Sequence, residues 1–545
     1  MRPDCSAALA AATLLCLAGL SAQAPAPTSA PLPADRSAGA DAVTEAQIRT
    51  WLGTLASEDF AGRGTGQEGY RKAAEYVRAH FKDLGYEPGA GDSFFQVVPW
   101  TKTGPVADAC SLRVTRGGKT LLDLGLDRLR GSASQDEDAS GPLTIVATRT
   151  LDGADLDGMD LSGRAVVLAL VGDALAAAGS EDWRARRAVQ RATVQLRNKV
   201  QQAGGNLVAF AHDGLAAVTG SFAESTGPSR RSGGPAAAGR NRAPTTVVLP
   251  GDAFEELLQA TLGEQRAKVG LDEGEDAVRI DTPAEVALEL DIETSDAPAY
   301  NVVAVLPGSD PELRDEYVAI GCHLDHLGIS ADGTIHPGAD DDGSGSAGLM
   351  AIAQAFAKNG TRPKRSILLM AFCGEERGLI GSAYFAANPT VPLASIVAEL
   401  QIDMIGRDEE KGDETAADNV NCLHLVGSQK LSDDLHQLCL RLNEERAQFA
   451  LEWDEEGVFY RSDHWNFARE GVPIAFFFTG FHPDYHRPTD TADKINYAKL
   501  RRIAMYVYDI GFELGNADAR PLVDAARWES LERKGRQEPV APVRR

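Results

Sequence analysis

Short apolar runs alternate with amphipathic helical patterns over the second half of the chain. Apolar runs predict strands at 301–306, 317–321, 367–372, 396–402, 423–426 and 474–478, and helical spacing predicts helices over 344–358 and 498–514. Continuous apolar strands separated by helices are typical of a sheet that is covered on both faces. The pattern therefore predicts an α/β sandwich over 283–515, whose ligands should collect at the carboxyl ends of its strands.

The rest of the chain contains several different kinds of segment. Apolar spacing predicts an amphipathic helix over 70–84, and we assign 43–130 to the N-terminal part of the main domain. Strand-like runs at 143–147, 165–171 and 207–211 predict a smaller, β-rich inserted unit over 131–282. Residues 25–42 are rich in Ala, Pro and Ser and are expected to form a disordered linker, and 516–545 a charged tail.

The first 24 residues have the order of parts of a secretory signal peptide. Arg2 precedes an apolar run over 7–20, and Ala22-Gln23-Ala24 follows it. The run is too short for a comfortable membrane span. We therefore expect an exported protein, periplasmic or secreted, with no stable membrane insertion once the signal is removed.

Composition and net charge limit the kinds of molecule that this protein can bind. The 545 residues contain 54 Lys and Arg against 79 Asp and Glu, a net charge of −25. Such a charge repels a phosphate backbone, so we expect no nucleic acid partner. Seven cysteines are present, two of them in the leader, without CxxC or zinc-finger spacing. We expect the others to be core thiols rather than a disulfide framework.

Acids and imidazoles follow several of the predicted strands. His323 and Asp325 lie two residues apart at a strand end, so their side chains point the same way, which suits a metal-binding imidazole whose second nitrogen is held by a carboxylate. Three aspartates, 340–342, precede the helix at 344. One aspartate is enough to cap a helix, and three favour a cation.

Three further segments add donors at the same edge of the sheet. Glu375 and Glu376 follow the strand at 367–372, Asp403 follows the next strand, and His486 lies in a polar turn after the strand at 474–478. Each segment alone is ordinary structure, but together they place nitrogen and carboxylate oxygen donors, without thiolate, at one edge. This donor set fits zinc, with cobalt or manganese as substitutes. Three carboxylates are balanced by two divalent ions and one hydroxide, so the charge favours a pair of ions.

The motifs HLDH, PGADDDGSG, CGEERG, QIDM and YHRPTDT together resemble the co-catalytic zinc peptidases of family twenty-eight, the aminopeptidase Y and glutamate carboxypeptidase group. They span His323 to Thr491. The resemblance implies a mixed-sheet α/β/α sandwich and two Zn²⁺ per chain. The inserted unit resembles a protease-associated domain.

Carried over to this sequence, the resemblance implies roles for eight residues. It makes Asp341 the bridge between the two ions, with His323 and Asp403 completing one site and Glu376 and His486 the other. Three further residues would act in catalysis: Glu375 as general base, Asp325 as the orienter of His323, and Tyr485 as a donor to the oxyanion.

The implied activity is hydrolysis of N-terminal residues from peptides by an exported dizinc aminopeptidase. A carboxypeptidase or dipeptidase on the same centre is the alternative, because the ligands do not reveal which end of the substrate is recognised. An inactive, receptor-like binding protein is a remote alternative, since all five ligands and Glu375 are present.

Overall fold

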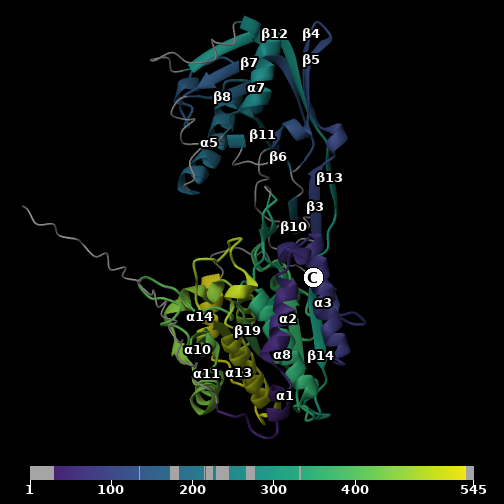
Figure 1. Cartoon of the computed structure of the whole chain (residues 1–545), viewed down its shortest axis with the longest axis vertical. Coiled ribbons are helices and arrows are strands. Elements are labelled where there is room, and N and C mark those ends of the chain that lie inside the picture. The colour runs from purple at the N-terminus through teal and green to yellow at the C-terminus, as the bar shows by residue number, and fades with distance from the viewer. Residues whose placement is uncertain are drawn as a thin grey trace, which may run out of the picture.

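A computed structural model describes residues 30–133, 135–171, 183–213, 215–216, 222, 225–228, 245–264, 277–330 and 333–535. The predicted signal peptide lies outside the described residues. Across those residues no helix has the length and apolar character needed to cross a membrane. Figure 1 shows a unit built on one large sheet, with a separate β-rich unit above it and strands β3 and β13 running between the two.

The main sheet confirms the predicted α/β fold. Its strand order is β1-β14-β18-β15-β19-β22-β20-β21, with β2 paired to β14. The four central strands run parallel to one another, whereas β14 and β20 are antiparallel to their central neighbours, so the sheet is mixed. The carboxyl ends of the four central strands therefore meet at one edge. The strands are β1 (Glu87–Pro88), β2 (Phe95–Val97), β14 (Tyr300–Leu306), β15 (Tyr317–His323), β18 (Ser366–Phe372), β19 (Ile396–Ile402), β20 (Cys422–Val426), β21 (Ala450–Glu452) and β22 (Ile474–Phe478).

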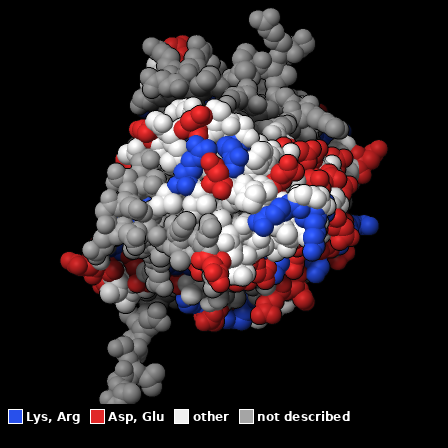
Figure 2. Space-filling model, turned by 90° about the horizontal axis from the view of Figure 1, so that it is seen from above, with Lys and Arg blue, Asp and Glu red and all other residues white. Residues whose placement is uncertain are grey.

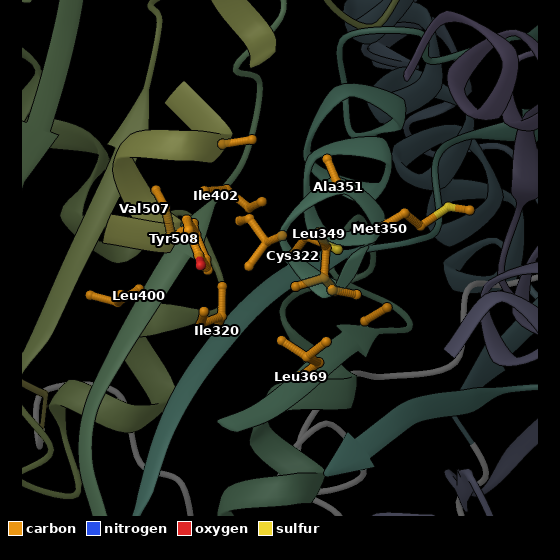
Figure 3. Packing of buried hydrophobic residues seen from close by; sticks show 14 of the residues in the cluster. Ile320, Cys322, Leu349, Met350, Ala351, Leu369, Leu400, Ile402, Val507 and Tyr508 are labelled. Carbon is orange, nitrogen blue, oxygen red and sulfur yellow. The ribbon is translucent and has the colours of Figure 1, made fainter. Parts of the chain in front are cut away.

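Alternate residues of the central strands fill two cores, one on each face of the sheet. In β15, Ile320 packs on one face and Ala319 on the other. The first face is covered by α2 (Glu45–Leu55), α3 (Glu68–Asp83), α8 (Gly343–Lys358), α11 (Asp433–Leu442) and α13 (Tyr497–Asn516), and the second by α9 (Ile380–Ala387), α10 (Ser428–Leu431), α12 (His464–Ala468) and α14 (Ala525–Gly535). Figure 3 shows Leu349 of α8 and Tyr508 of α13 packed over the strands. With both faces of the sheet covered by helices, the carboxyl ends of the central strands remain as the place where polar site residues can lie.

The β-rich unit has its own eight-stranded sheet, in the order β5-β4-β12-β7-β8-β9-β11-β6. Its presence supports the protease-associated assignment of the insert. A three-stranded sheet, β10-β3-β13, links it to the main unit. The elements of both sheets, with two helices, are β3 (Trp100–Pro105), β4 (Ser111–Arg116), β5 (Lys119–Gly125), β6 (Arg130–Ser132), β7 (Glu137–Thr148), β8 (Ala165–Leu170), α5 (Trp183–Gln202), β9 (Asn206–Ala211), β10 (Ser225–Pro228), β11 (Thr246–Leu249), α7 (Gly251–Leu262), β12 (Ala277–Leu290) and β13 (Ile292–Asp296).

The boundaries predicted for the insert, 131 and 282, are wrong. Strand β4 pairs with both β5 and β12, so residues 111–125 belong to the β-rich sheet rather than to the main domain. At the other end β12 continues to Leu290. The error arises because a strand's own sequence does not specify its sheet, which is decided by pairing between residues far apart in the chain.

The expected linker and tail are also more ordered than predicted. Residues 37–41 form helix α1 (Ser37–Asp41), and the preceding Arg36 is buried, with its guanidinium 3.0 Å from Asp509 Oδ1 and 2.8 Å from Glu513 Oε1. In the tail, α14 donates a hydrogen bond from Trp528 Nε1 to the carbonyl of Arg469. The ion pairs of Arg36 thus hold the N-terminal segment in place, and the hydrogen bond of Trp528 holds the C-terminal one, although the composition of both segments is polar.

The five cysteines of the described chain, Cys110, Cys322, Cys373, Cys422 and Cys439, are all free and buried, as predicted for core thiols. Seen from the β-rich end, acidic side chains are spread over the visible face and basic ones gather in a few places, in keeping with the net charge of −25 (Figure 2).

Candidate metal centre

The predicted donors converge at the carboxyl edge of the four parallel strands. His323 is the last residue of β15, Asp403 follows β19, and Glu375 and Glu376 follow β18. The loop after β22 brings in His486, and the turn before α8 supplies Asp341. Parallel pairing places these ends side by side, so segments distant in sequence share one site.

The first group of donors is formed by His323, Asp341 and Asp403. His323 Nε2 lies 3.3 Å from Asp341 Oδ1 and 3.4 Å from Asp403 Oδ1. All three residues are buried. Asp403 is held in place by Ser462, whose hydroxyl donates to Oδ2 over 2.7 Å. These are the three residues that the resemblance assigns to one of the two ions.

Asp341 also faces a second group, with Glu376 and His486. His486 Nε2 lies 3.1 Å from Asp341 Oδ2 and 3.2 Å from Glu376 Oε2. The two carboxylate oxygens of Asp341 therefore point to different imidazoles, which is the arrangement expected of a bridging ligand. His486 has a φ of +58°, in the left-handed region that is uncommon for a non-glycine residue and that recurs at functional sites.

His326 is a site residue to which the sequence interpretation gave no role. Its Nδ1 lies 2.8 Å from Glu376 Oε1 and 3.6 Å from Asp341 Oδ2, and the residue is buried. Its place in the HLDH motif, three residues after His323, is the feature that could have identified it. His326 lies beyond the end of β15, however, so strand alternation does not predict where its side chain points. Its imidazole is placed to hold the Glu376 carboxylate, as an outer partner of a metal ligand does.

The three consecutive aspartates have three different tasks. Asp342 caps helix α8 and accepts a hydrogen bond from the Gly345 N–H over 2.8 Å. Asp340 Oδ2 lies 3.2 Å from His482 Nε2. Between them Asp341 faces the two donor groups, while its backbone N–H donates to Asp490 Oδ2. Capping thus explains one of the three acids and the contact with His482 explains the second, which leaves Asp341 for a cation.

Charges within the cluster lower the pKa of the Asp341 carboxyl and raise that of the His486 imidazole. Burial alone would raise the pKa of Asp341, but the imidazoles of His326, His323 and His486 hold that pKa well below its usual range. Burial lowers the pKa of His486, yet Asp341 and Glu376 raise it to about 10. The site therefore favours ionised carboxylates beside positive charge, the condition that a bound cation also provides.

Glu375 lies beside the donor groups but is not part of either. Burial, with the charges of Glu376 and Asp403, raises the pKa of Glu375 well above its usual range, against the attraction of His323. It lines a cleft together with His323 and Tyr485. A carboxylate with a raised pKa at the wall of a cleft is suited to accept a proton.

Asp325 differs in detail from its predicted role. The contact that orients His323 comes from the backbone carbonyl of Asp325, which lies 3.0 Å from His323 Nδ1, whereas the carboxylate Oδ1 lies 4.0 Å away. The carboxylate instead accepts the backbone N–H of Glu375 over 3.2 Å. Burial raises the pKa of Asp325 to about 6. The residue thus connects the His323 loop to the Glu375 loop.

Tyr485 lines the same cleft as Glu375. Its ring stacks on His486 with centroids 3.9 Å apart, and Arg461 Nη2 donates to its hydroxyl oxygen over 3.3 Å. Burial and the charges of Asp341 and Glu376 raise the pKa of Tyr485, so the phenol keeps its proton. Arg461 also lines the cleft, and so do five apolar residues: Met404, Val458, Phe476, Phe478 and Phe481.

A buried arginine braces the loops that carry these donors. Arg63, from the N-terminal segment, is fully buried and donates to four carbonyl oxygens at 2.7–3.0 Å. Three of them, those of Leu324, Pro337 and Gly338, belong to the HLDH and PGADDDGSG segments. The N-terminal part of the chain is therefore required to shape the site.

The residues fit a pair of divalent cations. Asp341 Oδ2, Glu376 Oε1 and His326 Nδ1 are buried without a well-aligned hydrogen bond, although they lie close together. Among the described residues, His323, Asp341 and Asp403 form one group of donor atoms within 4.8 Å of one another, and His326, Asp341 and Glu376 another. Imidazole nitrogen and carboxylate oxygen are donors that suit zinc.

The fold and this donor set define the class of protein as an α/β sandwich with two adjoining cation-binding groups that share one carboxylate. Residues 301–510 match the sequence model of "Peptidase family M28", so this part of the chain is similar to that family.

Curated relatives match over a similar region. A "Probable leucine aminopeptidase" of Arthroderma otae is 27% identical over 226 residues, which cover 40% of this chain and 58% of the relative. "Leupeptin-inactivating enzyme 1" of Streptomyces exfoliatus is 30% identical over 202 residues, 37% of this chain and 40% of that protein. The matched region thus spans 58% of the length of the first of these relatives and 40% of the second.

Among solved structures, an aminopeptidase from Aneurinibacillus sp. strain AM-1 is similar over 90% of this chain and 98% of its own, with 19% identity and a TM-score of 0.46.

Proposed function

We propose that this chain is an exported dizinc aminopeptidase that removes N-terminal residues from peptides. The observation that carries the proposal is the position of Asp341, whose two carboxylate oxygens lie 3.3 and 3.1 Å from His323 Nε2 and His486 Nε2, beside Glu375 at the cleft wall. A shared carboxylate between two donor groups, next to a proton acceptor, is the arrangement that metal-assisted amide hydrolysis needs.

The residues around the cleft divide the chemistry between them. His323, Asp341, Glu376, Asp403 and His486 would hold a pair of divalent cations, which would supply Lewis-acid activation of water and of the scissile carbonyl. Glu375 accepts the proton of the attacking water and later delivers it to the leaving amine. The peptide C–N bond breaks as the new C–O bond replaces it, and the proton is conserved.

Tyr485 is placed to stabilise the oxyanion. Because Arg461 donates to the phenol oxygen, the O–H of Tyr485 is free to donate into the cleft. A donor whose position is fixed before the reaction stabilises developing charge without reorganisation.

An aminopeptidase that accepts apolar side chains is favoured over the carboxypeptidase or dipeptidase alternative for two reasons. The family match is accompanied by relatives named leucine aminopeptidases. In addition, Val458, Phe476, Phe478 and Phe481 line the cleft, so an apolar side chain next to the scissile bond would be buried there.

The test compares a leucine-led peptide with its N-acetylated form, and with a lysine-led peptide of otherwise equal sequence. The proposal predicts release of free leucine from the unblocked peptide, slower release of lysine, and no cleavage of the blocked peptide. Hydrolysis of the acetylated peptide alone would reject the aminopeptidase in favour of the alternative.

Export is a separate part of the proposal and has its own test. The Arg2, apolar-run and Ala22-Gln23-Ala24 sequence predicts a mature chain that starts after Ala24. N-terminal sequencing of the protein from the periplasm or the culture medium should give Pro25 as the first residue. Recovery only of a chain that begins at Met1, from inside the cell, would contradict export.

A further inference from the structure

A second set of metal-ligating side chains lies outside the centre described above. Glu409, Cys422, His424 and Glu452 each offer one donor atom, and these four atoms all lie within 4.8 Å of one another. The first three residues are buried and Glu452 is half-buried. None of the four is shared with the candidate metal centre.

Strand geometry explains why these residues meet. Cys422 and His424 lie two apart in β20, so they project from the same face of the sheet. Strand β21 pairs with β20 in parallel and sets Glu452 opposite His424. Glu409, from the segment between β19 and β20, completes the set, with its Oε2 3.1 Å from His424 Nε2. Cys422 Sγ lies 3.8 Å from the same nitrogen.

The donor types form a recognisable coordination set. One thiolate, one imidazole and two carboxylates supply four ligands of the kinds that hold zinc in proteins. The cluster places two carboxyl groups beside a thiol and an imidazole in a largely buried position, where a divalent cation would balance their charge.

The cluster also contacts the loop that carries Tyr485 and His486. The N–H of Glu410 donates to the carbonyl of Phe481 over 3.1 Å, and Gly480 packs so closely on Glu409 that a side chain at 480 would meet the carboxylate stem at 2.5–2.7 Å. Tyr485 and His486 follow a few residues later. An ion bound to Glu409 would therefore stabilise the position of this loop.

We propose that Glu409, Cys422, His424 and Glu452 bind a structural zinc ion, separate from the catalytic pair, which ties β20 and β21 to the loop before His486. The Cys422 thiol releases its proton to solvent when the ion binds, and His424 binds as the neutral imidazole. The site is closed by four protein ligands, as structural zinc sites are, and leaves no position for substrate.

Cobalt provides the test, because only this site contains sulfur. Chelator-treated full-length protein is titrated with Co²⁺ alone, and bound cobalt is counted while the near-ultraviolet absorption is recorded. The proposal predicts a third bound equivalent that is accompanied by a thiolate-to-cobalt charge-transfer band. The catalytic donors are nitrogen and oxygen, so cobalt bound at the catalytic centre gives no such band.

Two variants and one control make the assignment specific. Cys422→Ser should lose the band and one of the three equivalents, and Glu452→Gln, at a half-buried position, should weaken binding of the same equivalent by about tenfold or more. Cys110→Ser removes another buried thiol, in the β-rich unit, and should keep both signals. The proposal is overturned if saturating Co²⁺ produces no band in the parent protein, or if the band survives in Cys422→Ser.

Discussion

The role of Glu375 gives the most direct chemical prediction. Of the carboxylates that line the cleft, Asp341 and Asp403 each direct an oxygen at His323, which leaves Glu375 as the candidate proton acceptor. Glu375→Gln keeps the size and the hydrogen-bonding oxygen of the side chain but cannot take up a proton. The backbone N–H of residue 375, which donates to Asp325, is unaffected.

The expected loss follows from what a general base contributes. A positioned acid or base accelerates a reaction by about 10²–10⁴-fold, which corresponds to about 3–5 kcal/mol of activation free energy at 1.36 kcal/mol per tenfold. Because burial and neighbouring acids raise the pKa of Glu375, its proton affinity is greater than that of an ordinary carboxylate, and we expect a loss within this range. The fall should appear in kcat, with little change in KM, since the amide still fills the same space.

The assay is steady-state hydrolysis of a leucine-led reporter substrate across a range of pH. Glu470→Gln, an exposed glutamate of the same domain, is the matched control and should keep the parent rate. Metal content of the Glu375→Gln protein should equal that of the parent, because Glu375 belongs to neither donor group. A variant that retains its metal and hydrolyses the substrate within twofold of the parent kcat would show that the proposed base is wrong.

Three further changes probe the support of the site. Arg63→Met removes the guanidinium that binds four carbonyl groups and should lower the free energy of unfolding in urea by at least about 3 kcal/mol; an unchanged midpoint would contradict that role. His326→Ala should weaken metal binding about 10–100-fold in chelator competition, because the Glu376 carboxylate loses its partner at 2.8 Å, and unaltered affinity would remove His326 from the site. Burial raises the pKa of Asp463 from its ordinary value of 3.8 to about 7, so the folded chain binds this proton more tightly than the unfolded chain does. Stability of the chelated protein should then fall as the pH rises from about 4 to about 7, and Asp463→Asn should flatten that slope in pH-dependent melts.

Much of this site could be predicted because strand ends are visible in sequence. Continuous apolar runs located the four parallel strands, and the acid or imidazole that follows each run became a candidate ligand. Asp403 illustrates the reasoning, since a carboxylate directly after a buried strand requires positive charge or hydrogen bonds. The structure supplies both a neighbouring imidazole and the Ser462 hydroxyl.

Features that depend on backbone direction or on distant pairing could not be predicted in the same way. His326 reaches Glu376 from beyond the end of β15 at His323, where strand alternation no longer applies, and the carbonyl of Asp325 holds His323 in place of the carboxylate. The start of the β-rich unit is set by pairing between β4 and β12, which are separated by most of that unit. Likewise, Arg36 is buried by acids on α13, so the polar composition of its own segment was misleading.

The central claim is that Asp341 lies between two divalent cations. Crystals of the protein grown with zinc and measured on both sides of the zinc absorption edge would test it directly. Two anomalous peaks should flank Asp341, one beside His323 and Asp403 and the other beside Glu376 and His486, at ligand distances of about 2.0–2.2 Å. A single peak, or none, at this edge of the sheet in zinc-saturated crystals would contradict the account.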